Sequence, residues 1–193
     1  SKKEVSSNPL IYAVWNDNIK IIQLLLNHKD ILINMKSIDK TYENNGSVYI
    51  VEQLPLMEAM FPPNLEIIKL LLSHDQTDIN MKCKCYYLSS DDDVNKEELI
   101  EYITPLHKAI GNGSIEIVKL FLAHPKFDLN IRSFDQNDTS TNDYDESLLC
   151  YTFREKQYEI LKLLLQQPKI DVNSNCIVSY DHKSSNEEKT ILY

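Results

Sequence analysis

A short motif recurs four times along this chain and constrains its fold more than any other feature. The clearest copy runs from Thr104 to Ala109 as Thr-Pro-Leu-His-Lys-Ala, and weaker copies begin at Asn8, Leu54 and Ser147. In every copy a second apolar block begins thirteen positions after the motif starts, at Ile21, Ile67, Ile117 and Ile160. A fixed spacing inside copies of variable length indicates one supersecondary unit that is used four times.

Each copy has the features of two short helices. Thr104 can cap a helix through its hydroxyl, and Pro105 occupies a first-turn position where its missing N–H is not needed. Leu54 offers no capping oxygen, so we expect the second pair to have the least well-defined start. The second block is apolar nearly all round, which predicts a helix sandwiched between neighbouring copies, with Leu120 between two neighbours.

The motif, the Leu-rich second block and an Asp-x-Asn ending at 78–80, 128–130 and 171–173 together resemble the ankyrin repeat. The resemblance covers residues 8 to 173 and implies an all-α ankyrin solenoid of stacked helix-turn-helix units. The copies start 46, 50 and 43 residues apart, whereas ankyrin repeats usually run about 33. The excess lies where ankyrin folds carry their fingers, so elongated finger loops are expected, similar to those of protozoan ankyrin arrays.

We expect a single domain over residues 1–193, with repeats at about 8–53, 54–103, 104–146 and 147–189. Thr190 follows Ser147 by 43 residues, the interval that also separates Ser147 from Thr104. Residues 190–193 therefore resemble the start of a further repeat, and the natural protein is expected to be longer. The alternative is that residues 174–193 form a private C-terminal cap.

Composition narrows the classes of partner. A net charge of −9 argues against nucleic acid, because phosphate contacts need a basic surface. No apolar stretch approaches the length of a membrane span, so we expect a monomer that binds proteins and no membrane. The four cysteines show no framework spacing, which favours free thiols and a cytoplasmic location. The acidic residues cluster in the inserts. They are either solvated loops or a surface that attracts a partner with a basic patch.

Catalytic and metal-binding patterns are weak, so we expect no enzyme, cofactor or metal site. The sequence contains no nucleophile motif, and its three glycines are too few for a glycine-rich phosphate-binding loop. His28, His74 and His124 recur at helix ends, too far apart for one metal, and are expected to bond free helix carbonyls. Residues 135–146 match the oxygen positions of a calcium loop, but Ser140 stands where glycine is needed. A calcium- or loop-regulated switch, or a targeting segment of a larger enzyme, stays the alternative function.

The resemblance implies a protein-binding scaffold whose fingers and first helices form a concave groove. Trp15 is expected either to anchor a partner or to pack beneath an insert, and packing is favoured for Phe61. The predicted partner-binding residues are the exposed positions of the first helices and one acidic run, namely Tyr12, Trp15, Asn16, Phe61, Asn112, Arg154, Glu155, Asp91, Asp92 and Asp93.

Overall fold

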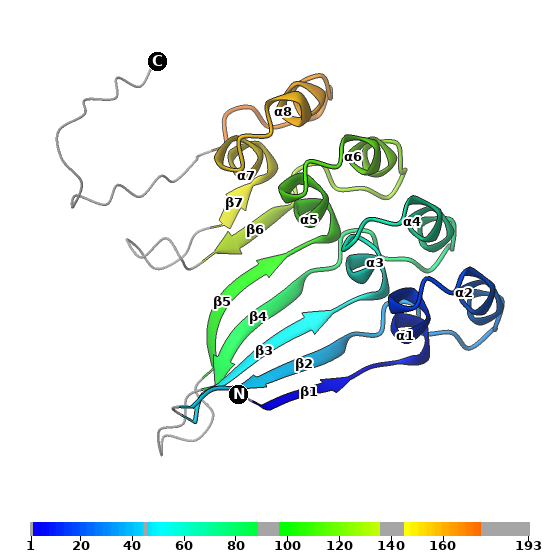
Figure 1. Cartoon of the computed structure of the whole chain (residues 1–193). Helices are drawn as coiled ribbons and strands as arrows, with labels where there is room; N and C mark the ends of the chain where they lie inside the picture. Colours follow the sequence, from blue (N-terminus) through cyan, green and yellow to red (C-terminus); the bar gives the residue numbers. More distant parts are fainter. Residues whose placement is uncertain (1, 45, 89–96, 136–144, 175–193) are drawn as a thin grey trace.

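The computed structural model describes residues 2–44, 46–88, 97–135 and 145–174, which contain four stacked helix pairs (Figure 1). We call the first helix of each pair inner and the second outer. The inner helices are α1 (Pro9–Trp15), α3 (Pro55–Glu58), α5 (Pro105–Gly111) and α7 (Leu148–Arg154). The outer helices are α2 (Ile19–Leu26), α4 (Leu65–Leu72), α6 (Ile115–Leu122) and α8 (Tyr158–Leu165). None of the described helices is long and apolar enough to cross a membrane.

The inner helices begin where the capping residues predict. The Asn8 side chain accepts a hydrogen bond from the Ile11 N–H at 2.9 Å, and Thr104 forms a capping box with His107. Leu54 provides no side-chain cap, and α3 spans only four residues against seven in the other inner helices. The expected weak start of the second pair is confirmed, because four N-terminal amides of a helix need partners that a leucine cannot supply.

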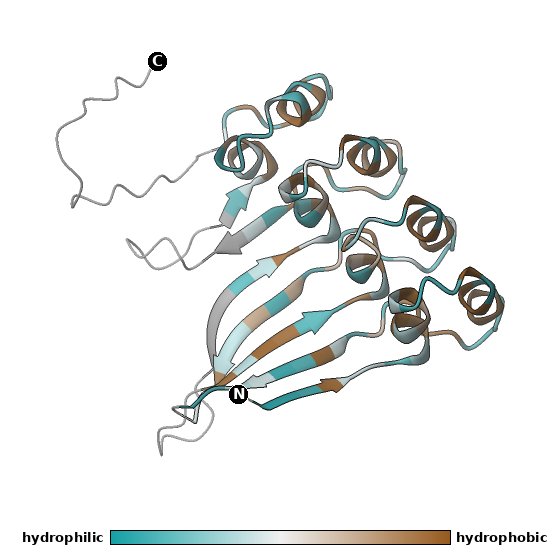
Figure 2. Ribbon diagram, in the orientation of Figure 1, coloured by the Kyte–Doolittle hydropathy of each residue, from teal (hydrophilic) through white to brown (hydrophobic). Residues whose placement is uncertain are grey.

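The core lies between the helix pairs, and Figure 2 shows apolar residues concentrated on the helices. On the outer helices Ile67 and Phe121 have no exposed surface and Ile117 is 3% exposed. Leu120, which the sequence places between two neighbours, is only partly buried at the edge of this cluster. That expectation is wrong by one residue, since the helix turns Phe121 rather than Leu120 fully into the stack.

The expectation of an all-α fold is wrong, because the N-terminal segment and the three inserts form a seven-stranded antiparallel sheet with strand order β1 to β7. Each insert leaves an outer helix along one strand and returns along the next strand to the following inner helix (Figure 1). The strands are β1 (Lys2–Ser6), β2 (Ser37–Tyr42), β3 (Val48–Gln53), β4 (Cys83–Leu88), β5 (Glu97–Ile103), β6 (Arg132–Asp135) and β7 (Asp145–Ser147).

The sheet forms because neighbouring fingers are long enough to pair with one another. Residues 48–51 read Val-Tyr-Ile-Val, a composition that suits a pleated surface. In the antiparallel register Tyr49 lies opposite Tyr87, and Val51 lies opposite Cys85. Pairing between hairpins supplies partners for backbone N–H and C=O groups that a lone hairpin would leave at its edges.

The asparagines that end the first three repeat units, two of them in Asp-x-Asn endings, join successive repeats. The Asn80 side chain donates to the Lys126 carbonyl at 2.7 Å and accepts from the Asp128 N–H at 2.9 Å. The same two bonds run from Asn34 to the second repeat and from Asn130 to the fourth. Each asparagine therefore uses both ends of its amide to fix the position of the next turn.

The helix-end histidines act differently from what the sequence suggested. The Nδ1 atom of His28 accepts a hydrogen bond from the Asp30 N–H at 3.3 Å, and His74 and His124 accept from the residues two positions on at the same distance. The imidazoles thus accept from turn amides rather than donate to helix carbonyls, and the expected bonding to carbonyls is wrong.

The cysteines are not all free thiols. Cys83 and Cys85 are free and buried, but Cys150 is disulfide-bonded. The expectation of free thiols is therefore wrong for Cys150. Since disulfides are rare in reducing compartments, the cysteines no longer support a cytoplasmic location.

Three of the four turns between paired helices contain a residue with positive φ, at Asp17 (49°), Gly113 (65°) and Lys156 (56°). A left-handed backbone strains any residue that has a Cβ.

Replacing Lys156 by glycine is therefore expected to raise the free energy of unfolding by about 0.5–1 kcal/mol, measured by urea denaturation. Gly113→Ala is the opposite substitution and should lower the free energy of unfolding, since its added Cβ would also lie 3.1 Å from the Gln157 side chain. Equal effects of the two substitutions would contradict the strain argument.

Candidate functional site

The inner helices, and the turn that follows α3, carry two rows of equivalent positions along the stack. The two positions of each repeat are three residues apart, which places them on one face of the helix in the first, third and fourth repeats, whereas Phe61 lies in the turn after α3. The first row is Tyr12, Glu58, Lys108 and Tyr151, and the second row is Trp15, Phe61, Gly111 and Arg154.

Second-row residues reach the first row of the following repeat. The indole Nε1 of Trp15 donates a hydrogen bond to the carboxylate Oε2 of Glu58. The Lys108 ammonium lies 5.8 Å from the centroid of the Phe61 ring. These contacts link the two rows from repeat to repeat, and we call the surface that the rows form the concave surface.

The third and fourth repeats meet through a small residue. Gly111 carries no side chain, and a Cβ added there would lie 3.2 Å from the Tyr151 hydroxyl. Arg154 lies over the Tyr151 ring at 4.9 Å and bonds Glu146 at 3.1 Å. Glycine at 111 thus leaves room for the tyrosine of the next repeat.

The predicted aromatic residues are largely exposed. Tyr12 is 64% exposed, Phe61 74% and Trp15 40%. The expectation that Phe61 packs beneath an insert is therefore wrong. Trp15 lies between its two alternatives, since its ring is partly exposed and its N–H is used in the bond to Glu58. We call these three exposed rings, which belong to the first two repeats, the aromatic ridge.

The predicted polar residues mostly serve the fold. Asn16 donates to the Tyr12 carbonyl at 2.7 Å, and Asn112 donates to the Met60 carbonyl at 3.0 Å. Glu155 pairs with Arg154 at 3.1 Å. Asp91, Asp92 and Asp93 lie outside the described residues, as does most of the 135–146 insert with its calcium-loop pattern.

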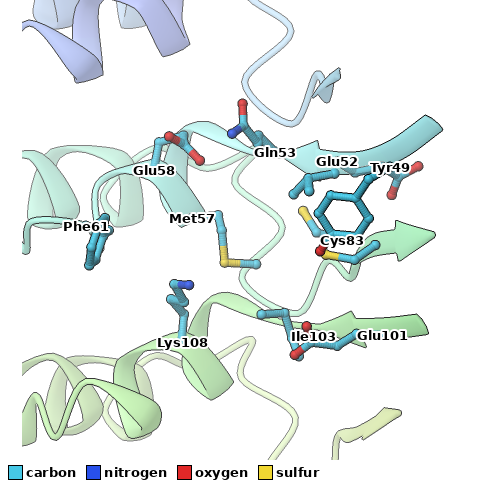
Figure 3. A pocket seen from close by; sticks show the side chains of 12 residues that line it. Tyr49, Glu52, Gln53, Met57, Glu58, Phe61, Cys83, Glu101, Ile103 and Lys108 are labelled. Carbon is cyan, nitrogen blue, oxygen red and sulfur yellow. The ribbon is translucent and has the colours of Figure 1, made fainter. Parts of the chain in front are cut away.

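A pocket of about 340 Å³ opens where the sheet meets α3 and α5, and we call it the corner pocket (Figure 3). Its residues come from β3, α3 and the turn that follows it, β4, β5 and α5: Tyr49, Val51, Glu52, Gln53, Met57, Glu58, Phe61, Cys83, Cys85, Glu101, Ile103 and Lys108. Phe61 is the one lining residue that the sequence predicted to bind a partner. Glu58 was accessible to the same reasoning, because it is the second-repeat equivalent of Tyr12 and lies three residues before Phe61.

Burial controls the ionisation of this pocket. It raises the pKa of Glu58, while the Trp15 hydrogen bond and the Lys108 charge act in the opposite direction. Burial raises the pKa of the Cys83 thiol to about 12 and also raises the pKa of Cys85. Thiols of this kind stay protonated at neutral pH and are poor nucleophiles. The two thiols are therefore poorly suited to act as nucleophiles in this pocket.

Comparison with known proteins identifies two matching segments. Residues 82–176 match a family model described as ankyrin repeats in three copies, and residues 7–38 match a family model of the single ankyrin repeat. Together the two segments cover more than half of the chain. A search of curated proteins finds no match.

Proposed function

The chain belongs to the ankyrin repeat family, whose members are generally protein–protein interaction modules, and from this we propose that residues 1–193 form one domain that binds a partner protein through its concave side. The binding surface would consist of the two rows on the inner helices and the adjoining face of the sheet. The proposed role is that of a non-enzymatic scaffold.

The observation that carries this proposal is the aromatic ridge beside the corner pocket. Tyr12 and Phe61 expose more than 60% of their surface, although aromatic rings gain most when they are removed from water. Tyrosine and tryptophan are enriched among the few residues that dominate binding energy in interfaces. A ridge of rings next to a concavity is the arrangement that a protruding segment of a partner can cover.

Charge favours a partner with a basic patch. The chain carries a net charge of −9, and Glu58 and Glu101 line the corner pocket against the single lysine Lys108. We propose that the acidic inserts, including Asp91, Asp92 and Asp93, steer such a partner during encounter. Neutralising those three aspartates would slow association and flatten its salt dependence, with little effect on dissociation.

Truncation of the ridge tests the proposal. Tyr12→Ala and Phe61→Ala are each expected to weaken partner binding at least about tenfold, or about 1.4 kcal/mol, while circular dichroism stays unchanged because both rings are exposed. The matched control is Tyr158→Ala on α8, whose ring is 55% exposed on an outer helix. Affinity capture on immobilised protein, with quantitative mass spectrometry, would identify proteins lost with both ridge variants and kept by the control. Equal capture by all three variants would contradict the proposal.

A further inference from the structure

The corner pocket is short of hydrogen-bond donors. The Glu58 carboxylate accepts one hydrogen bond, from Trp15 to Oε2, and its Oε1 accepts none from any described residue. The Gln53 Oε1 in the same pocket is buried and has no partner among the described residues. A carboxylate and an amide oxygen can each accept more than one bond. An occupant that supplies several donors would therefore satisfy atoms that the protein leaves unpaired.

The nearby cations do not fill this need. Lys108, on α5, lowers the pKa of Glu58 through its charge, yet makes no hydrogen bond to it among those described and lies over Phe61 instead. Lys3, on β1, is paired with Asp39 of β2 at 2.6 Å. Asp39 adds a second negative charge that acts on Glu58. The field at Glu58 thus favours a further positive group.

The walls of the pocket suit a flat cation. The exposed Phe61 ring already attracts the Lys108 ammonium, and Met57 and Ile103 supply apolar surface for an aliphatic stem (Figure 3). A guanidinium is planar, carries five N–H donors and stacks on aromatic faces. Because a guanidinium is more weakly hydrated than an ammonium group, its desolvation on entering the pocket costs less free energy.

Resting on the proposed protein-binding function, we infer that the corner pocket takes an arginine side chain of the partner, with its guanidinium bonded to Glu58 Oε1 and laid against Phe61. The pocket volume of about 340 Å³ lies at the small end of ligand sites, which run from about 300 to 1,000 Å³. That size fits one side chain of a bound segment. In this proposal the aromatic ridge contributes most of the buried contact area, and the corner pocket accounts for the preference for arginine.

The chain contains its own reporter for this site. Trp15 is the single tryptophan of the sequence, and its indole N–H donates to the carboxylate that would bind the guanidinium. Titration with N-acetyl-arginine amide at low salt is expected to shift the Trp15 fluorescence and its indole N–H resonance with a Kd on the order of 1 mM. N-acetyl-citrulline amide, the uncharged analogue, and N-acetyl-lysine amide should each bind at least about fivefold more weakly.

Variants separate the pocket from its surroundings. Glu58→Gln retains an acceptor for Trp15 and is expected to weaken the arginine probe at least about tenfold. Glu66→Gln on the outer helix α4, an exposed glutamate away from the pocket, is the matched control and should have no effect. Binding to the wild type should also weaken as pH falls through the raised pKa of Glu58, because a protonated carboxyl loses its charge. Equal binding of arginine and citrulline, or no effect of Glu58→Gln, would overturn the inference.

The two proposals fail in different ways. If Tyr12→Ala and Phe61→Ala abolish partner capture while Glu58→Gln neither changes capture nor weakens the arginine probe, the protein-binding function stands and the arginine pocket falls. If the probe binds through Glu58 but every concave variant captures the same proteins as the wild type, the protein-binding function falls.

Discussion

Replacing Phe121 by alanine is expected to lower the free energy of unfolding by about 3–5 kcal/mol. Phe121, in the last turn of α6, has no exposed surface, and its ring meets Phe127 edge to face with centroids 6.2 Å apart. Removing the ring would leave a cavity between neighbouring repeats, and stacked repeats close such cavities poorly because each touches only its neighbours.

Urea denaturation followed by circular dichroism would measure this loss. The matched control is Phe153→Ala, since Phe153 is 61% exposed and its truncation should change stability by less than about 1 kcal/mol. Leu120→Ala, one residue before Phe121, should give an intermediate loss because Leu120 is partly buried. Equal losses at Phe121 and Phe153 would contradict the packing of α6 between two repeats.

The second large effect concerns pH. Burial lowers the pKa of His107 from 6.5 to about 3, assisted by the positive charges of Lys82 and Arg154. In the unfolded chain His107 binds a proton below about pH 6.5, whereas in the folded protein it stays neutral until about pH 3. The stabilisation is therefore complete above pH 6.5 and is lost progressively as pH falls. Between pH 7.5 and 5 the free energy of unfolding is expected to fall by about 2 kcal/mol.

The local structure explains why the protonated form is rejected. The Nδ1 atom of His107 lies 2.8 Å from the Thr104 hydroxyl in the capping box. Its Nε2 is buried and without a hydrogen-bond partner among the described residues, with the Tyr151 ring edge-on at 4.9 Å. A second N–H would add a buried charge that nothing nearby compensates.

Denaturation curves at several pH values would test this slope against the His107→Gln variant, which cannot titrate. Its absolute stability can differ, because the capping box changes, but its loss between pH 7.5 and 5 should be smaller by about 2 kcal/mol. Parallel pH profiles for the two proteins would show that other groups cause the acid sensitivity.

The sequence by itself determined the helix pairs. Their positions follow from the thirteen-residue spacing, and the capping residues placed the helix starts, including the short α3 behind Leu54. These features are local, because a cap and an apolar face depend on residues within two turns of each other. Counting a fixed number of positions from each motif also located Trp15 and Phe61, although the sequence favoured packing for Phe61, which is exposed.

Only the tertiary structure decided the sheet and the corner pocket. Strand-forming residues such as those at 48–51 were visible in the sequence, but pairing Tyr49 with Tyr87 joins residues of two different inserts. Whether separate fingers pair depends on how the helix pairs stack, which no single insert encodes. Glu58 likewise gained its place beside Trp15 from that stacking. The helices follow from neighbours along the chain, whereas the sheet and the pocket follow from neighbours in space.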